Sequence, residues 1–303
     1  MSLGSRSKSL DLYSEVSASQ VTALGEAIPD FPERAVKVSF KEAGVACNEE
    51  IPREFSKFFA VMSALAAGDL HGKRLLDVGT GLGVLVAQAK CMGMIATGTD
   101  TFTEYESTCR SGALCIFEAY GHSREEAERS FLHHDITEGP VPDRYDFVTS
   151  IGMMEHIYGD ETRKVAIDNM MKSVAPGGSL ILACGPNQYF PIDFFHYGPR
   201  FVFYHNLPLR GRRAYLRAFA GPAACHDARW LDGMRVAEIR RHILESEPEA
   251  EVRQLFPLWV RASNSPWLRS RLVRAAAETA ARVLSAINAE PVIILVASRP
   301  VTK

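Results

Sequence analysis

Three glycines at alternate positions, Gly79, Gly81 and Gly83, constrain this chain more than any other feature. The apolar residues 75–78 precede them and are typical of a buried strand, and residues 84–90 are typical of a helix. A strand, a glycine turn and a helix together present backbone N–H groups and a helix N-terminus to a nucleotide. Glycine is needed because a Cβ would block the tight turn and the close approach of a ligand. The run predicts a nucleotide-type ligand, and a purely structural glycine turn is the alternative.

The spacing of the glycines indicates which nucleotide is bound. A dinucleotide fingerprint has the form Gly-x-Gly-x-x-Gly, and its third glycine would fall at position 84, which is Val84. Asp77 lies two residues before the first glycine. A carboxylate at the strand end suits a neutral ribose and a cationic methionine better than a pyrophosphate. The spacing therefore disfavours a nicotinamide dinucleotide.

Further acidic motifs follow at the ends of later predicted strands. Residues 94–100 are a strand that ends in Asp100, which can accept both hydroxyls of a ribose diol. Residues 131–136 are a short strand ending near Asp135, and residues 145–157 are a strand and loop with a Glu-His pair. A Pro-Gly-Gly turn and another strand lie within residues 175–183. His133 and His134 point to opposite faces of their strand, so no metal site is expected.

These four motifs, in this order, resemble those of class I S-adenosylmethionine-dependent methyltransferases, the broad group that includes ubiquinone-pathway and glycan methyltransferases. The resemblance spans residues 75–185 and fades on both sides. It implies an α/β fold: a Rossmann-like, seven-stranded, mostly parallel sheet with helices on both faces, an antiparallel last strand and a large insertion before it. It also implies S-adenosyl-L-methionine as cofactor, bound by Asp77, Gly79, Thr80, Gly81, Gly83, Asp100, Thr101, Asp135, Ile136, Ser150 and Ile151.

The domain organisation follows from where the resemblance ends. We expect an N-terminal arm over residues 1–50 with a short helix at 19–27, a cofactor-binding core over 51–185, a substrate lid over 186–289 and a final core strand over 290–303. Periodicity predicts helices at 52–67, 104–120, 160–174, 234–245 and 266–288, and strands at 251–260 and 291–297. The start of the lid is rich in aromatic residues. It contains His196, which joins His156 as a candidate general base.

Charge is unevenly distributed along the chain, although the net charge is only -2. From Tyr189 onward there are 17 Lys and Arg against 10 Asp and Glu. This favours an anionic partner such as a phosphate, an acidic glycan or a membrane surface, and an arginine-rich solvated surface is the alternative. Helix 266–288 fits either packing on the fold or lying at a membrane surface. We expect no nucleic-acid partner.

Cysteine usage and the N-terminus indicate the compartment. The six cysteines have no paired spacing, which favours free thiols in a reducing cytoplasm and disfavours zinc. The first residues lack the apolar core of a signal peptide, and no apolar stretch reaches 18 residues. Together the observations predict a cytoplasmic methyltransferase that methylates an oxygen of a small molecule, sugar, glycan or lipid-linked acceptor. A nicotinamide-dependent oxidoreductase and a non-catalytic cofactor-binding protein are the alternatives.

Overall fold

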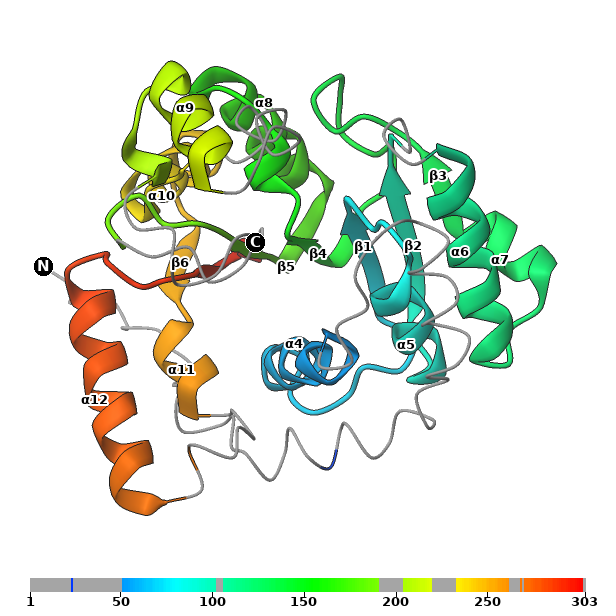
Figure 1. Cartoon of the computed structure of the whole chain (residues 1–303). Helices are drawn as coiled ribbons and strands as arrows, with labels where there is room; N and C mark the ends of the chain where they lie inside the picture. Colours follow the sequence, from blue (N-terminus) through cyan, green and yellow to red (C-terminus); the bar gives the residue numbers. More distant parts are fainter. Residues whose placement is uncertain are drawn as a thin grey trace, which may run out of the picture.

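A computed structural model describes residues 23, 51–101, 106–190, 204–219, 233–261, 268 and 270–301. Seven strands of the described chain form one sheet in the order β3-β2-β1-β4-β5-β7-β6 (Figure 1). They are β1 (Arg74–Val78), β2 (Ile95–Asp100), β3 (Phe131–His133), β4 (Tyr145–Ile151), β5 (Val174–Cys184), β6 (Glu251–Gln254) and β7 (Ile293–Ser298). The predicted fold class is confirmed.

The strand directions bring the predicted motifs to one edge of the sheet. β1 pairs in parallel with β2 on one side and with β4 on the other, and β3 and β5 extend the parallel part. β7 runs antiparallel to both β5 and β6. In this register Asp77 lies opposite Gly98 of β2 and Thr149 of β4. Since parallel strands end at the same edge, the polar residues that follow β1, β2 and β4 share that edge.

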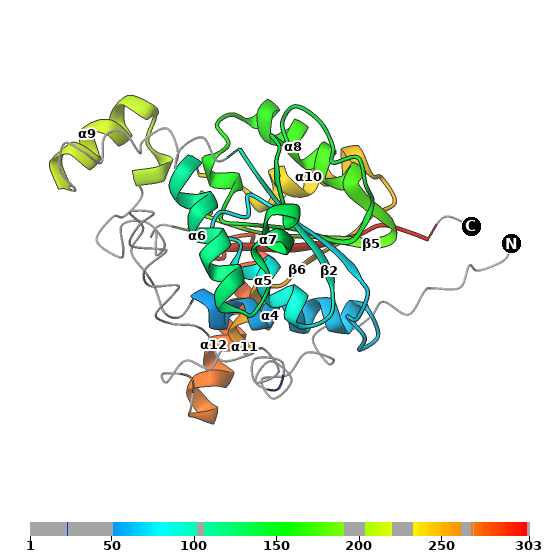
Figure 2. The same ribbon diagram turned by 90° about the vertical axis from the view of Figure 1, so that its right-hand side faces the viewer.

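Helices cover both faces of the sheet (Figures 1 and 2). Alternation along β1 sends Leu75 into one core and Leu76 into the other. The Leu75 core contains residues of α4, α5, α6, α7 and α11, and the Leu76 core contains residues of α8 and α10. The helices are α4 (Ile51–Leu65), α5 (Val84–Cys91), α6 (Glu106–Ala119), α7 (Arg124–Ser130), α8 (Asp160–Ser173), α9 (Leu209–Phe219), α10 (Val236–Ser246), α11 (Phe256–Arg261) and α12 (Arg271–Ala286), with short 3-10 turns η1 (Met154–His156) and η2 (Tyr204–Asn206).

Most predicted helices are present with shifted ends, and α7 and α9 are additions. α7 begins after Ser123, whose hydroxyl oxygen accepts a hydrogen bond from the backbone N–H of Glu126 at 3.1 Å. This is an N-cap, which stabilises the first turn of a helix. The strand predicted over 131–136 is shorter than expected. β3 ends at His133, so Asp135 lies in the following turn.

The strand predicted over residues 251–260 is wrong in its second half. β6 ends at Gln254, and α11 begins at Phe256. The N–H of Leu255 donates to the carbonyl of Ile294 in β7, and the N–H of Trp259 donates to the carbonyl of Leu255 at 2.9 Å. Leu255 thus ends the ladder and starts the helix. Pro257 cannot donate to a strand ladder but fits the first turn of a helix.

The predicted lid range, 186–289, contains parts of the core. Both β6 and α10 lie within it: β6 belongs to the sheet and α10 packs on α8. Of the remaining segment, α9 extends away from the sheet (Figure 2). Residues 191–203 and 220–232 lie outside the described residues, as does the predicted N-terminal arm apart from residue 23. The lid remains a prediction for the portion that surrounds α9.

The last long helix, α12, packs mainly against α11 (Figure 1). Its inward residues include Ala281 and Ser285, whereas Leu272 is 83% exposed. None of the helices in the described part of the chain combines the length and the apolar character needed to cross a bilayer.

Candidate functional site

The glycine turn follows β1 and has the backbone conformation that glycine permits. Gly79, Gly81 and Gly83 all have positive φ angles, 73°, 51° and 67°. The N–H groups of Gly79 and Thr80 donate to the carbonyl of Thr99 in β2, at 2.8 and 3.0 Å. Gly83 is the N-cap residue of α5. The turn is therefore fixed to the neighbouring strand and leads directly into a helix N-terminus, as the sequence predicted.

Gly81 is the residue of this turn whose Cβ position faces open space, an arrangement called here its open point. A Cβ built on Gly81 would meet no heavy atom of the described residues within 4 Å, whereas one on Gly79 would collide with the side chain of Met153. The N–H of Gly81 donates to a carboxylate oxygen of Asp100 at 3.0 Å. The turn thus leaves free space beside a carboxylate, which fits the ribose and methionine portions of S-adenosylmethionine.

Asp77 lies beneath the turn and is buried. Its carboxylate accepts a hydrogen bond from the Thr149 hydroxyl of β4 at 2.8 Å. Burial raises the pKa of Asp77 to about 6, and the hydrogen bond from Thr149 opposes that rise. A buried carboxyl with a raised pKa beside a glycine turn is typical of a functional site. The contribution of Thr149 was missed because a threonine within a strand carries no distinctive sequence signal.

The other two predicted acids, Asp135 and Asp100, both accept hydrogen bonds from nearby groups. One oxygen of Asp135 accepts from both the N–H and the hydroxyl of Thr137, at 2.8 and 2.7 Å. This local turn fixes the Asp135 side chain in the loop after β3. Ile136 is buried, and its carbonyl accepts from the side-chain amide of Asn169 in α8 at 2.7 Å. Asp100 and Thr101 stand at the end of β2, next to the glycine turn.

The end of β4 forms the wall of the site beside β1. Ser150 is fully buried and Ile151 is half-buried. Gly152 follows, with its N–H donating to the carbonyl of Ala183 in β5 at 2.8 Å. The structure thus brings the predicted residues of β1, β2 and β4 to one edge of the sheet, and their contacts with a cofactor remain a prediction.

The two residues of the Glu-His pair, both on η1, differ in exposure. Glu155 is buried and His156 is exposed. Before them, Met153 packs against Gly79. Since a catalytic base has to reach the acceptor, the outward position suits His156, and Glu155 belongs to the packing of the loop. The second candidate base, His196, lies outside the described residues.

Comparison with known proteins supports the same interpretation of the chain. The family model described as "Methyltransferase domain" matches residues 48–256, which is more than half of the sequence. Ubiquinone biosynthesis O-methyltransferase of Klebsiella pneumoniae is 30% identical over 117 residues, covering 39% of this chain and 44% of that protein. Its counterpart in Shewanella pealeana is 33% identical over 112 residues, covering 37% and 43%. The chain spans less than half the length of these curated relatives.

Solved structures with a similar arrangement have low sequence identity. Magnesium protoporphyrin IX methyltransferase of Synechocystis is 15% identical with a TM-score of 0.47, and the match covers 92% of this chain and 99% of that one. A TehB-like S-adenosylmethionine-dependent methyltransferase of Corynebacterium glutamicum is 12% identical with a TM-score of 0.46, covering 89% and 99%.

Three findings therefore agree: the order of the four motifs, the glycine turn with its open point at Gly81, and the family match over residues 48–256. These findings favour a methyltransferase over the two alternatives, a nicotinamide-dependent oxidoreductase and a non-catalytic cofactor-binding protein. The chain belongs to the methyltransferase domain family, as a class I S-adenosylmethionine-dependent methyltransferase.

Proposed function

We propose that this protein transfers a methyl group from S-adenosylmethionine to an oxygen atom of a small-molecule acceptor. The observation that supports it most is the open space at Gly81 beside the Asp100 carboxylate, at the carboxyl edge of the sheet. The matched relatives are named as ubiquinone biosynthesis O-methyltransferases, which favours oxygen as the acceptor atom.

The protein's own residues have three tasks in such a reaction. S-adenosylmethionine supplies a methyl carbon that its positively charged sulfur already activates. The glycine turn, Asp77 and Asp100 would hold the donor, and Asp135 would bind its adenine. Orienting two reactants supplies part of the ~7–11 kcal/mol available from proximity. His156 takes the proton of the acceptor hydroxyl, which adds about 10²- to 10⁴-fold.

The acceptor classes consistent with this site are small molecules, sugars or glycans, and lipid-linked compounds. α9, which lies within the predicted lid, contributes the exposed Arg213 and Phe219. A guanidinium group suits a phosphate-bearing acceptor, and an aromatic ring suits a stacked one. An anionic acceptor is therefore part of the proposal.

Peripheral contact with a membrane is a second part of the proposal, supported by α12. Leu272, Val283 and Ile287 are 83%, 58% and 63% exposed and share one face of the helix. The exposed Arg271 and Arg282 lie alongside, which favours anionic lipid. Co-sedimentation with phosphatidylserine vesicles tests this: wild type should bind, and the double variant Leu272→Ser, Ile287→Ser should not.

Free thiols at Cys91, Cys115 and Cys184 suit a cytoplasmic location.

Calorimetry and a transfer assay test the main proposal. S-adenosylhomocysteine should bind to the purified protein, and NADH should not. With methyl-labelled S-adenosylmethionine and a panel of phenols, sugars and lipid-linked hydroxyl compounds, His156→Gln should lower kcat by about 10²-fold or more while leaving S-adenosylhomocysteine affinity unchanged. Binding of NADH without binding of S-adenosylhomocysteine would refute the proposal.

A further inference from the structure

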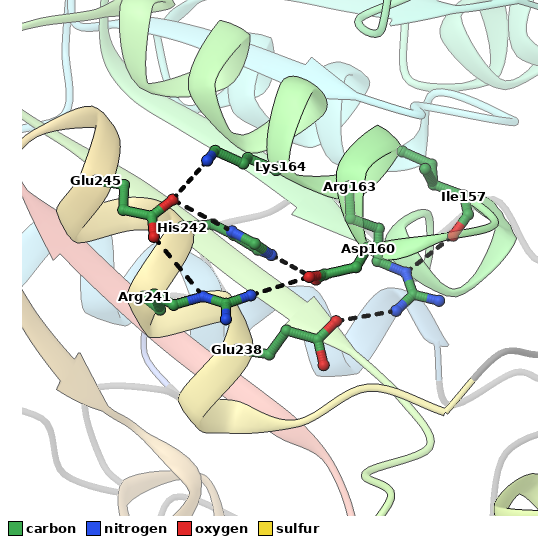
Figure 3. A network of polar contacts seen from close by, with 8 residues as sticks. All are labelled: Ile157, Asp160, Arg163, Lys164, Glu238, Arg241, His242 and Glu245. Carbon is green, nitrogen blue, oxygen red and sulfur yellow. Dashed lines mark hydrogen bonds and ion pairs between the residues drawn. The ribbon is translucent and has the colours of Figure 1, made fainter.

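A buried arginine, Arg163, lies at the interface of α8 and α10 and contacts Ile157 in the segment that follows β4 (Figure 3). The Arg163 side chain is 4% exposed. Its Nε donates to the carbonyl oxygen of Ile157 at 2.9 Å, and its Nη1 lies 3.4 Å from a carboxyl oxygen of Glu238 in α10. A buried guanidinium is costly unless partners satisfy it, so these contacts hold Arg163 in a defined position.

The carbonyl that Arg163 binds belongs to the residue after η1. Ile157 follows His156, and Met153 at the other end of η1 packs against Gly79 of the glycine turn. η1 is thus fixed at both ends, to the turn by Met153 and to α8 by Arg163. A displacement of the Ile157 carbonyl would change the position of His156 and the packing on Gly79 together.

Glu238 connects this contact to a larger network across the two helices. Arg163 and Asp160 of α8 face Glu238, and Arg235 and His242 face it from its own helix region. Asp160 accepts from His242 Nε2 at 2.6 Å and from Arg241 Nη2 at 2.9 Å. Ligand atoms of Asp160, Glu238 and His242 come within 4.8 Å of one another, a spacing that suits a cation, but the guanidinium groups of Arg163 and Arg241 already contact Glu238 and Asp160.

The two carboxyls share a proton. Burial raises the pKa of Glu238 to about 7, and the neighbouring Asp160 raises it further. The hydrogen bond with Glu238 is the main reason that the pKa of Asp160 falls to about 2. The protonated Glu238 therefore donates to the ionised Asp160, which joins α10 to the first turn of α8.

We propose that Arg163 is a positioning residue for the methyl-transfer site: held by Glu238, it fixes η1 and, through Met153, keeps the glycine turn in its cofactor-binding form. This inference rests on the proposed function only in taking the glycine turn as the cofactor site. Arg163 acts through the Ile157 carbonyl, which makes it a positioning residue and not a catalytic one.

Three variants of the full chain test the inference by calorimetry with S-adenosylhomocysteine and by hydrogen–deuterium exchange of peptides covering residues 152–159. Arg163→Lys keeps the charge but loses the planar pair of donors. It should weaken S-adenosylhomocysteine binding about tenfold and speed exchange at 152–159 more than in β1 or β5. Lys164→Met is the matched control: Lys164 pairs with Glu245 at 2.8 Å across the same helices, whereas the side-chain hydrogen bond to the Ile157 carbonyl comes from Arg163. It should change neither quantity.

Glu238→Gln adds a readout that general destabilisation would not produce. The amide keeps the donor to Asp160 but cannot ionise, so it cannot form the charge-assisted pair with Arg163 that wild-type Glu238 forms once it loses its proton. The ratio of variant to wild-type affinity for S-adenosylhomocysteine should fall about threefold or more from pH 6 to pH 8. The titration of Asp77 is common to both proteins and cancels in this ratio.

The outcomes separate this inference from the proposed function. Wild-type affinity and exchange in Arg163→Lys, or an equal loss in Lys164→Met, overturns the positioning role. A constant affinity ratio for Glu238→Gln overturns the involvement of Glu238. If the wild type binds no S-adenosylhomocysteine, the proposed function fails, and exchange at 152–159 in Arg163→Lys still decides whether Arg163 holds the loop.

Discussion

Replacing Glu290 with Gln should make the fold more resistant to rising pH. Glu290 lies just before β7 and is 0% exposed, and neither of its carboxyl oxygens meets a hydrogen-bond donor among the described residues. Burial disfavours the charged form and raises the pKa of Glu290 from 4.5 to about 7. The substitution removes the ionisation and keeps the size of the side chain.

The magnitude follows from proton linkage. Below pH 4.5 Glu290 is protonated in both the folded and the unfolded chain, so its ionisation costs nothing. Between pH 4.5 and about 7 the unfolded chain releases a proton that the folded chain keeps, and the free energy of unfolding falls by about 1.4 kcal/mol per pH unit. Above pH 7 the folded form ionises as well, and the accumulated cost levels off at roughly 3 kcal/mol.

Urea unfolding followed by circular dichroism at pH 5, 6, 7 and 8 measures this effect. The stability difference, Glu290→Gln minus wild type, should grow by roughly 2 to 3 kcal/mol from pH 5 to pH 8. Any constant cost of burying the amide cancels in that change. Glu249→Gln, at an exposed carboxyl, is the control and should show no such growth. A difference for Glu290→Gln that stays constant with pH would refute the reasoning.

Three further predictions concern the proposed site, and a fourth concerns the stability of α9. Asp100→Ala should weaken S-adenosylhomocysteine binding roughly 10- to 100-fold in calorimetry, because a charge-assisted hydrogen bond is worth about 1.5–3 kcal/mol; unchanged affinity would exclude this acid from the site. Gly81→Val should abolish that binding, since a side chain would fill the open space and φ is 51°; normal binding would mean that the turn is not the cradle. Arg213→Ala should raise KM for an anionic acceptor and leave S-adenosylhomocysteine affinity unchanged, with wild-type turnover falling as salt screens the charge over ~10 Å at 0.1 M. Arg212 is buried, so Arg212→Ala should instead lower the melting temperature, and an unaltered melting curve would contradict that assignment.

The parallel half of the fold was predictable because its signals are local. Most strands from β1 to β5 contain apolar residues and are followed by a glycine, an acid or a polar loop, and the Gly-rich turn marks the start of α5. The N-cap at Ser123 was also readable from the sequence, since Ser123 and Glu126 have capping-box spacing, and α7 could have been found from it.

What the sequence could not predict depends on contacts between distant residues. Arg163 and Glu238 are 75 positions apart, and neither belongs to a motif. Met153 looks like an ordinary core residue until its packing against Gly79 is seen. The change from β6 to α11 at Leu255 is set by the end of pairing with β7, which a local apolar run does not reveal. Sequence patterns therefore locate the cofactor edge but not the interactions that hold it.

The order β5-β7-β6 has a consequence for how the molecule is assembled. β7 is the last strand of the described chain, yet it lies between β5 and β6 and pairs with both. Until it is in place, β5 presents an open edge and β6 has no partner in the sheet. Pairing across such separations closes a long loop and is slow. During synthesis, the newly made chain therefore exposes a strand edge that attracts other chains until β7 is in place.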